Sequence, residues 1–119
     1  MVTDNTLLKF GFSKDENNHQ LKKALKNNIK IKQIHIDIYT ENPLSSSNCF
    51  MLLLRTSEKN VTITNDENRL IIKKNDKYKN HIMNVLFSKV TECFFKVSEG
   101  CSEFILNIQN IYYKITVFN

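Results

Sequence analysis

Glycine, proline, tryptophan and arginine are all scarce in this sequence of 119 residues. It contains two glycines, one proline and no tryptophan. Two glycines do not supply the closely spaced sets that dinucleotide-binding and Walker phosphate loops require. The sequence also shows no nucleophile motif ahead of a helix and no carboxylate pair outside a turn. We therefore predict a protein that is not an enzyme and needs no cofactor.

Membrane-spanning, secretory and metal-binding signals are missing as well. No apolar run approaches the roughly 20 residues of a membrane span. The first five residues lack the basic and apolar regions of a secretory signal. Three cysteines without a C-x-x-C pair suit a reducing compartment, so we expect a cytoplasmic or nuclear protein. His19, His35 and His81 are isolated from one another, and no metal site is expected.

The overall composition is that of an ordinary globular protein, with 41% hydrophobic and 24% charged residues. A chain of this length corresponds to one domain, since domains cluster near roughly 100–150 residues. We expect a single compact domain over residues 1–119. Period-two alternation and short apolar runs predict strands at 8–12, 29–39, 49–54, 61–64, 69–73, 104–108 and 111–118.

Individual strands carry further predictions. The parity of the isoleucines changes near Lys32-Gln33, which predicts a bulge or bend. The run 49–54 is apolar throughout, as in a central strand. Polar turns at 65–68 and 109–110 predict two hairpins.

Two helices are predicted between these strands. Ser13 and Glu16 form the S-x-x-E pattern of a capping box, so a first helix should begin there and end near residue 27. A second, longer helix is expected over 77–98, with Gly100 as its left-handed terminator. The predicted fold is therefore α+β, in the order β-α-β-β-β-β-α-β-β, with a mostly antiparallel sheet and two helices.

The predicted helix 77–98 is apolar over an arc of about 200°, nearly twice what one sheet can cover. Its excess apolar edge carries Met83, Phe87 and Phe94, with Phe95 just outside it. Either another part of the chain covers this edge, or it forms a partner surface. The last strand also has no charged residue after Lys114, so at a sheet edge it would invite strand addition.

These features predict a non-enzymatic protein-interaction subunit of a larger intracellular complex. Its partner would be another subunit or a second copy of the chain. The contact would use the apolar face of helix 77–98, through Met83, Phe87, Phe94 and Phe95, or the C-terminal edge strand.

The alternative is a nucleic-acid-binding module, suggested by the formal net charge of +5. The basic residues concerned are Arg69, Lys73, Lys74, Lys77 and Lys79, which run from a strand end into the start of a predicted helix. Only Arg55 and Arg69 are arginine, the residue that reads guanine edges, so binding without base-specific readout is expected. The lysine excess equally fits a bias toward AT-rich codons.

Overall fold

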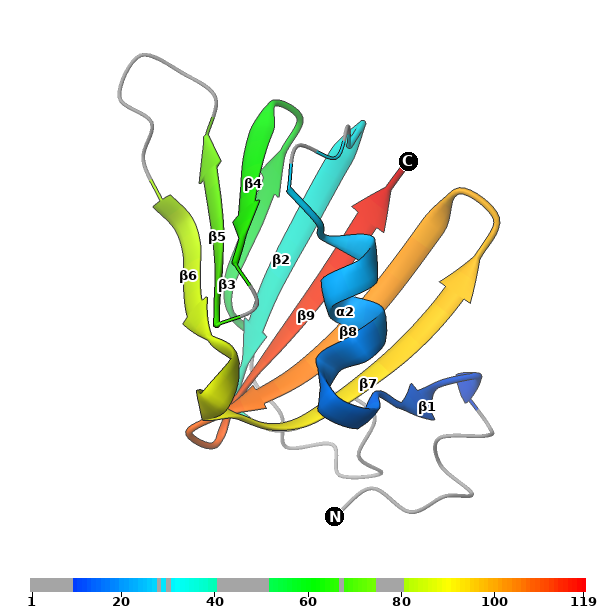
Figure 1. Cartoon of the computed structure of the whole chain (residues 1–119), viewed down its shortest axis with the longest axis vertical. Helices are drawn as coiled ribbons and strands as arrows, with labels where there is room; N and C mark the ends of the chain where they lie inside the picture. Colours follow the sequence, from blue (N-terminus) through cyan, green and yellow to red (C-terminus); the bar gives the residue numbers. More distant parts are fainter. Residues whose placement is uncertain (1–9, 28, 30, 41–51, 67, 75–80) are drawn as a thin grey trace.

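Figure 1 shows the computed structural model of the chain, in which a curved six-stranded sheet carries one helix and a smaller three-stranded sheet. The structure describes residues 10–27, 29, 31–40, 52–66, 68–74 and 81–119. The larger sheet has the order β1-β7-β8-β9-β2-β3 and the smaller sheet the order β4-β5-β6. All pairings between these strands are antiparallel. The predicted class, an α+β domain with a mostly antiparallel sheet, is confirmed.

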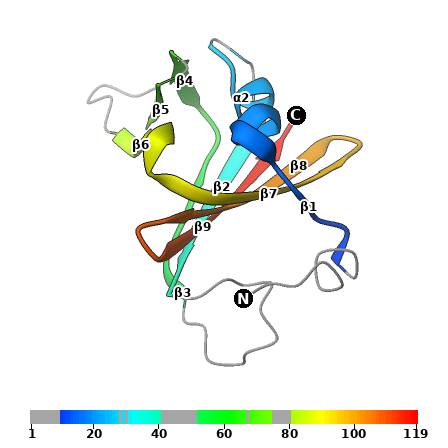
Figure 2. The same cartoon turned by 60° about the horizontal axis from the view of Figure 1, so that its bottom comes forward.

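The strands are β1 (Ser13–Lys14), β2 (Gln33–Tyr39), β3 (Leu52–Glu58), β4 (Val61–Asn65), β5 (Arg69–Lys74), β6 (His81–Leu86), β7 (Val90–Ser98), β8 (Cys101–Ile108) and β9 (Ile111–Phe118). The helical elements are the 3₁₀ turn η1 (Glu16–Asn18), the α-helix α2 (His19–Ala24) and the 3₁₀ turn η2 (Phe87–Lys89). Figure 2 shows that α2 and the three-stranded sheet lie on the same side of the larger sheet.

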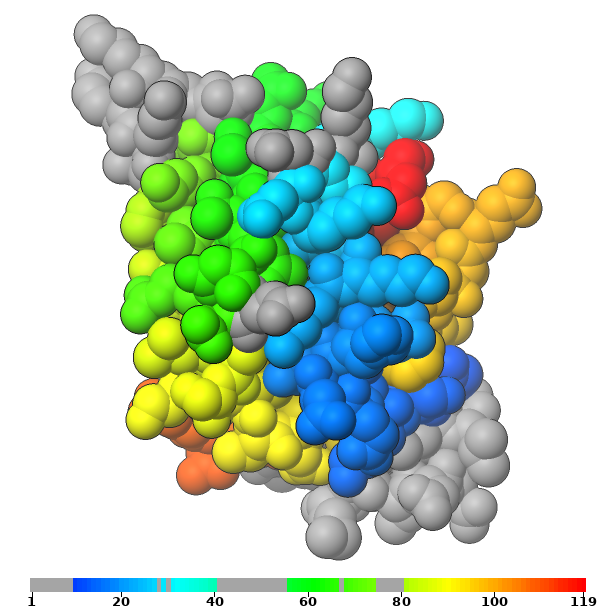
Figure 3. All heavy atoms as spheres, in the orientation of Figure 1, coloured from blue at the N-terminus to red at the C-terminus, as the bar shows by residue number. Residues whose placement is uncertain are grey.

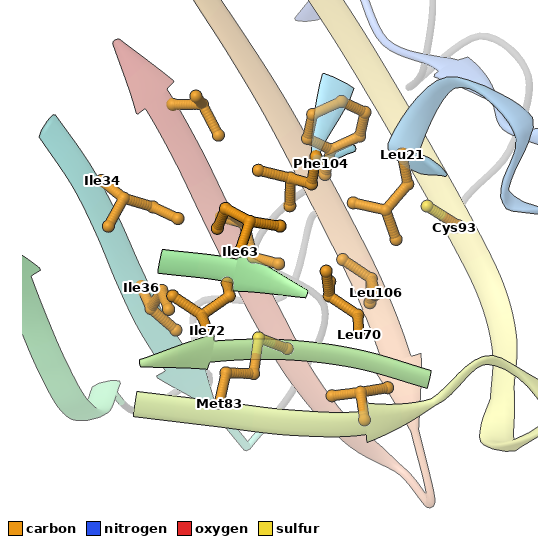
Figure 4. Packing of buried hydrophobic residues seen from close by; sticks show 14 of the residues in the cluster. Leu21, Ile34, Ile36, Ile63, Leu70, Ile72, Met83, Cys93, Phe104 and Leu106 are labelled. Atoms are coloured by element: carbon orange, nitrogen blue, oxygen red, sulfur yellow. The ribbon is translucent and has the colours of Figure 1, made fainter. Parts of the chain in front are cut away.

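The main core fills the space between these layers (Figure 4). Alternate residues of a strand point to the same face, so β2, β7, β8 and β9 of the larger sheet contribute alternate side chains to this core. Fully buried residues from the larger sheet, the smaller sheet and the helical segment meet there: Leu21, Leu25, Ile34, Ile63, Leu70, Ile72, Phe104, Leu106, Ile115 and Val117. Burying one such aliphatic side chain stabilises the fold by about 1.5–3 kcal/mol.

A second, smaller cluster lies on the opposite face of the larger sheet. Phe94 of β7 and Ile105 of β8 are register partners, and Phe12 packs on them. Tyr112 of β9 is partly buried against the same group. The larger sheet is therefore apolar on both faces where β7 and β8 meet.

The predicted helix 77–98 is wrong. The described part of this segment is strand β6, turn η2 and strand β7. The residues Ile82, Val85, Val90, Thr91, Phe94 and Phe95 are β-branched or aromatic, types that favour strands. Because β6 is apolar on its inner face and β7 is apolar on both, their residues mimic a very broad helical stripe. Gly100 has the left-handed φ expected of it (+75°), but it forms the β7–β8 hairpin turn rather than a helix end.

The first predicted helix exists, but it begins later than expected. Ser13 lies in β1, which pairs with β7, and so cannot act as the cap. The helix α2 starts at His19, and Leu21 and Leu25 are buried as predicted. Asp15, which no sequence pattern singled out, has the capping role described below.

The strand predictions fare better. The hairpins β4–β5 and β8–β9 are confirmed, with Gln109 and Asn110 both at positive φ in the second turn. The strand β2 begins at Gln33, where the parity change predicted a bend. The central strand expected at 49–54 is not found in the described residues, because β3 pairs only with β2 and ends the larger sheet. Residues 49–51 and the first two residues of the strand predicted at 8–12 lie outside the described residues. The rest of that prediction is wrong, because residues 10–12 are not in a strand and β1 begins at Ser13.

Candidate functional site

The four residues predicted to bind a partner do not share a surface. Met83 and Phe87 are buried in the main core, at 5% and 6% exposure. Phe94 is buried in the second cluster on the other face of the larger sheet. Phe95 is half-buried against the main core. The apolar helix face proposed as a docking surface does not form, because the helix itself does not form.

The C-terminal strand is not at an edge either. The strand β9 lies between β8 and β2 and is paired along its length with both. Its backbone groups are therefore hydrogen-bonded within the sheet. The prediction that the C-terminal strand forms an edge for strand addition is wrong. Tyr112 and Tyr113 lie on opposite faces of this internal strand.

The basic group predicted for nucleic acid is only partly described. Lys77 and Lys79 lie outside the described residues. Arg69 and Lys73 lie on the outer face of β5, because Leu70 and Ile72 between them point into the core. Lys74 forms an ion pair with Glu58 of β3 at 3.0 Å. The three strands of the smaller sheet contain no aspartate or glutamate, so their outer face is basic.

The strand β6 lies at the outer edge of the smaller sheet, and among the described residues it pairs only with β5. Its sequence, His-Ile-Met-Asn-Val-Leu, contains no lysine, arginine, carboxylate or proline. Its last residue, Leu86, is 37% exposed. Figure 3 shows β6 and η2 along one margin of the molecule.

The other edge strand of the same sheet, β4, is attached at its end to the segment after α2. The side-chain amide of Asn65, at the end of β4, donates to the carbonyl of Leu25 at 3.0 Å. Its backbone N–H donates to Asn27 at 2.5 Å. The turn after α2 is thereby joined to β4, and the two elements are in contact across the face shown in Figure 3.

A cavity of about 430 Å³ opens where the end of β6 meets the β8–β9 turn. Its polar lining comes from Arg69, Asn84, Lys89, Gln109 and Tyr113, and its apolar lining from Val85, Leu86 and Ile108. Two positive charges and three neutral hydrogen-bonding groups therefore line one opening. We call this site the Arg69–Lys89 pocket.

A larger cavity, of about 660 Å³, lies beside η1 and α2. Its lining mixes Lys14 and Lys22 with Asp15 and Glu16. Both carboxylate oxygens of Asp15 are already engaged, accepting the backbone N–H groups of Gln20 and Leu21 at 2.8 and 2.9 Å. The Asp15 carboxylate in this cavity therefore serves to cap the start of α2.

The described cysteines lack the environment of a nucleophile. Cys93 is buried, and its thiol donates to the Asp15 carboxylate across 3.6 Å. Burial, reinforced by the negative charge of Asp15, raises the pKa of the Cys93 thiol above its ordinary value. Burial also raises the pKa of Cys101, and Glu103 adds to this effect. Among residues 10–40, 52–74 and 81–119, as far as they are described, no three His, Cys or acidic side chains are grouped for a metal ion.

Compared with known proteins, the chain matches no family model, no curated protein and no solved structure. None of the helices in the described part of the chain is long and apolar enough to cross a membrane. The features of the described residues that bear on function are therefore the exposed edge of β6, the basic outer face of the smaller sheet and the Arg69–Lys89 pocket.

Proposed function

We propose that the chain is a non-enzymatic protein-interaction module that receives an extended protein segment along strand β6. An edge strand presents a row of backbone N–H and C=O groups that can pair with another strand. Natural edges are usually protected by lysine, proline or a very short length. Strand β6 has six residues and neither of these residue types, and this single observation carries the proposal.

The three remaining edges, β1, β3 and β4, support the choice of β6. Strand β3, which ends the larger sheet, contains the charged residues Arg55 and Glu58, and charged residues discourage pairing at an edge. Strand β1 has two residues, too few for a ladder of several hydrogen bonds. Strand β4 is joined through Asn65 to the turn after α2. The exposed Leu86 beside the β6 edge adds apolar area for a partner.

The purified chain provides a direct test, because two copies of β6 can pair with each other about a two-fold axis. We expect a concentration-dependent dimer in sedimentation velocity, with amide exchange in β6 slowing as the dimer forms. The double variant His81→Lys with Asn84→Lys places two charges on exposed positions of β6. It should raise the dimer dissociation constant at least about tenfold, equivalent to about 1.4 kcal/mol.

The matched control is Thr62→Lys with Thr64→Lys on β4. These exposed threonines lie in the same rows of the same sheet, opposite Lys73 and Ile71, so the added charge is equal. The control should dimerise like the wild type. The proposal would be contradicted if the wild type stayed monomeric at the highest concentration reached. It would also be contradicted if the β4 and β6 variants raised the dimer dissociation constant equally.

A second candidate function is binding of the nucleic-acid backbone by the outer face of the smaller sheet. It is favoured by Arg69 and Lys73 on one face of β5, within three strands that contain no carboxylate. Lysine-driven contacts to phosphate give affinity without base-specific readout.

This candidate predicts affinity for a short DNA or RNA duplex that falls steeply with salt. Replacing Lys73 by glutamine should lower the slope of log affinity against log salt by about one, the loss of one phosphate contact. Lys96→Gln, on the larger sheet, is the control and should leave the slope unchanged. No retention of the wild type on either nucleic acid at about 50 mM salt would dismiss this function.

A further inference from the structure

The Arg69–Lys89 pocket brings together groups from four separate elements and one hairpin turn. Arg69 comes from β5, Asn84 from β6, Lys89 from η2 and Tyr113 from β9. Gln109 comes from the turn between β8 and β9. Such convergence of polar groups on an opening with an apolar wall is typical of small-ligand sites, whose volumes are about 300–1,000 Å³.

The charge of the pocket is of one sign. Arg69 and Lys89 are positive, and no aspartate or glutamate is among the lining residues. The carboxylate of the neighbouring Asp66 accepts the backbone N–H groups of Asn68 and Arg69, at 3.0 and 2.8 Å. Those hydrogen bonds, with a smaller contribution from the Arg69 charge, lower the pKa of Asp66. This carboxylate closes the β4–β5 turn.

Hydrogen bonds join Arg69 to Asn84 and fix the turn that carries Gln109. The guanidinium of Arg69 donates from Nη1 to the Asn84 side-chain oxygen at 2.9 Å. Because that oxygen accepts from Arg69, the other end of the Asn84 amide is a donor. Gln109 sits in a turn fixed by Asn107, whose side-chain oxygen accepts the N–H of Asn110 at 3.0 Å.

We propose that the Arg69–Lys89 pocket binds a phosphate monoester carried on an aromatic or aliphatic group. A monoester carries about −1.5 to −2 charges at pH 7 and three strong acceptor oxygens, which match two cations and several neutral donors. Arginine suits phosphate in particular, because its fork donates two parallel hydrogen bonds. Val85, Leu86 and Ile108 would contact the carrier of the phosphate. This inference goes beyond strand addition and nucleic-acid binding and depends on neither.

The test uses phenyl phosphate as the probe, with binding to the full chain followed by amide chemical shifts. We expect the largest shifts at Lys89, Gln109 and Tyr113, and affinity at least about fivefold higher than for inorganic phosphate, because apolar contact adds to the charge. Lys89→Ala should weaken binding about tenfold. Lys89 is exposed, so this variant should keep the wild-type melting temperature.

Lys59→Ala is the matched control, because Lys59 is an exposed lysine in the β3–β4 turn and outside the pocket. It should bind phenyl phosphate like the wild type. Equal weakening by both variants, shifts centred on α2, or no preference over inorganic phosphate would each overturn the proposal. A phosphotyrosine peptide distinguishes the two sources of the monoester. Added affinity from its flanking residues assigns the pocket to a phosphorylated protein, and equal affinity assigns it to a free metabolite.

Discussion

Replacing Phe87 and Phe94 by serine should unfold the domain. Phe87 lies in the main core, with the ammonium of Lys22 4.8 Å from its ring centroid. Phe94 lies in the second cluster with Phe12 and Ile105. Truncating a buried phenylalanine costs about 3–5 kcal/mol, and a whole domain of this kind is stable by about 5–15 kcal/mol. The double variant should therefore show no cooperative thermal melt at 25 °C or above.

The single variants should each remain folded, with losses that add. The two rings lie in separate clusters on opposite faces of the larger sheet, and distant sites without shared partners are usually additive. Leu86→Ser and Val97→Ser are the controls, since these neighbouring apolar residues are 37% and 57% exposed. They should change stability by about 0.5 kcal/mol or less. If the double variant melted like the wild type, Phe87 and Phe94 would not be core residues, and the prediction would be wrong.

The parts of the fold that could be predicted are those set by neighbouring residues. The β4–β5 and β8–β9 hairpins follow from alternating strands around short polar turns, in which asparagine tolerates positive φ. The bend before Gln33 follows from the parity of adjacent isoleucines. Each of these signals is contained within a few residues of the chain.

The segment 77–98 could not be assigned correctly, because its pattern has two explanations. Strands that are apolar on one or both faces, interrupted by a short turn, place apolar residues at helical as well as strand spacing. Phe94 and Phe95 show the difficulty, since these adjacent residues pack into separate apolar clusters on opposite faces of β7, Phe94 buried and Phe95 half-buried. One sheet cannot cover so broad an apolar arc of a helix. The excess width of the arc therefore indicates strands rather than a helix.

The candidate surfaces depend on strand order, which is a property of the whole fold. Nothing within residues 111–118 indicates that β9 lies between β8 and β2, or within residues 81–86 that β6 lies at an edge. The polar groups of the Arg69–Lys89 pocket are likewise spread between residues 69 and 113. Of these groups only Arg69 could be named from the sequence, as part of the basic run.

Asp15→Ala should be the most destabilising change of a single charged residue in the described part of the chain, at about 3 kcal/mol. Its carboxylate accepts the N–H groups of Gln20 and Leu21 and the thiol of Cys93. Hydrogen bonds to charged groups contribute about 1.5–3 kcal/mol each, and the N–H of the fully buried Leu21 would lose its acceptor. Urea unfolding would give the loss of stability, and amide exchange would show it concentrated in α2.

The neighbouring residue supplies the control for this prediction. Glu16→Ala removes the same charge one position along the chain, but Glu16 is exposed, so the change should stay within about 0.5 kcal/mol. Asp15→Asn keeps one oxygen acceptor and should lose about half as much stability as Asp15→Ala, because the charge and the second acceptor are gone. The backbone hydrogen bond from the N–H of residue 15 to the carbonyl of Cys93 is 2.7 Å long. It should persist in each variant, because only side chains are changed. A loss from Asp15→Ala no larger than that from Glu16→Ala would mean that packing of Leu21 and Leu25 alone holds α2 on the sheet.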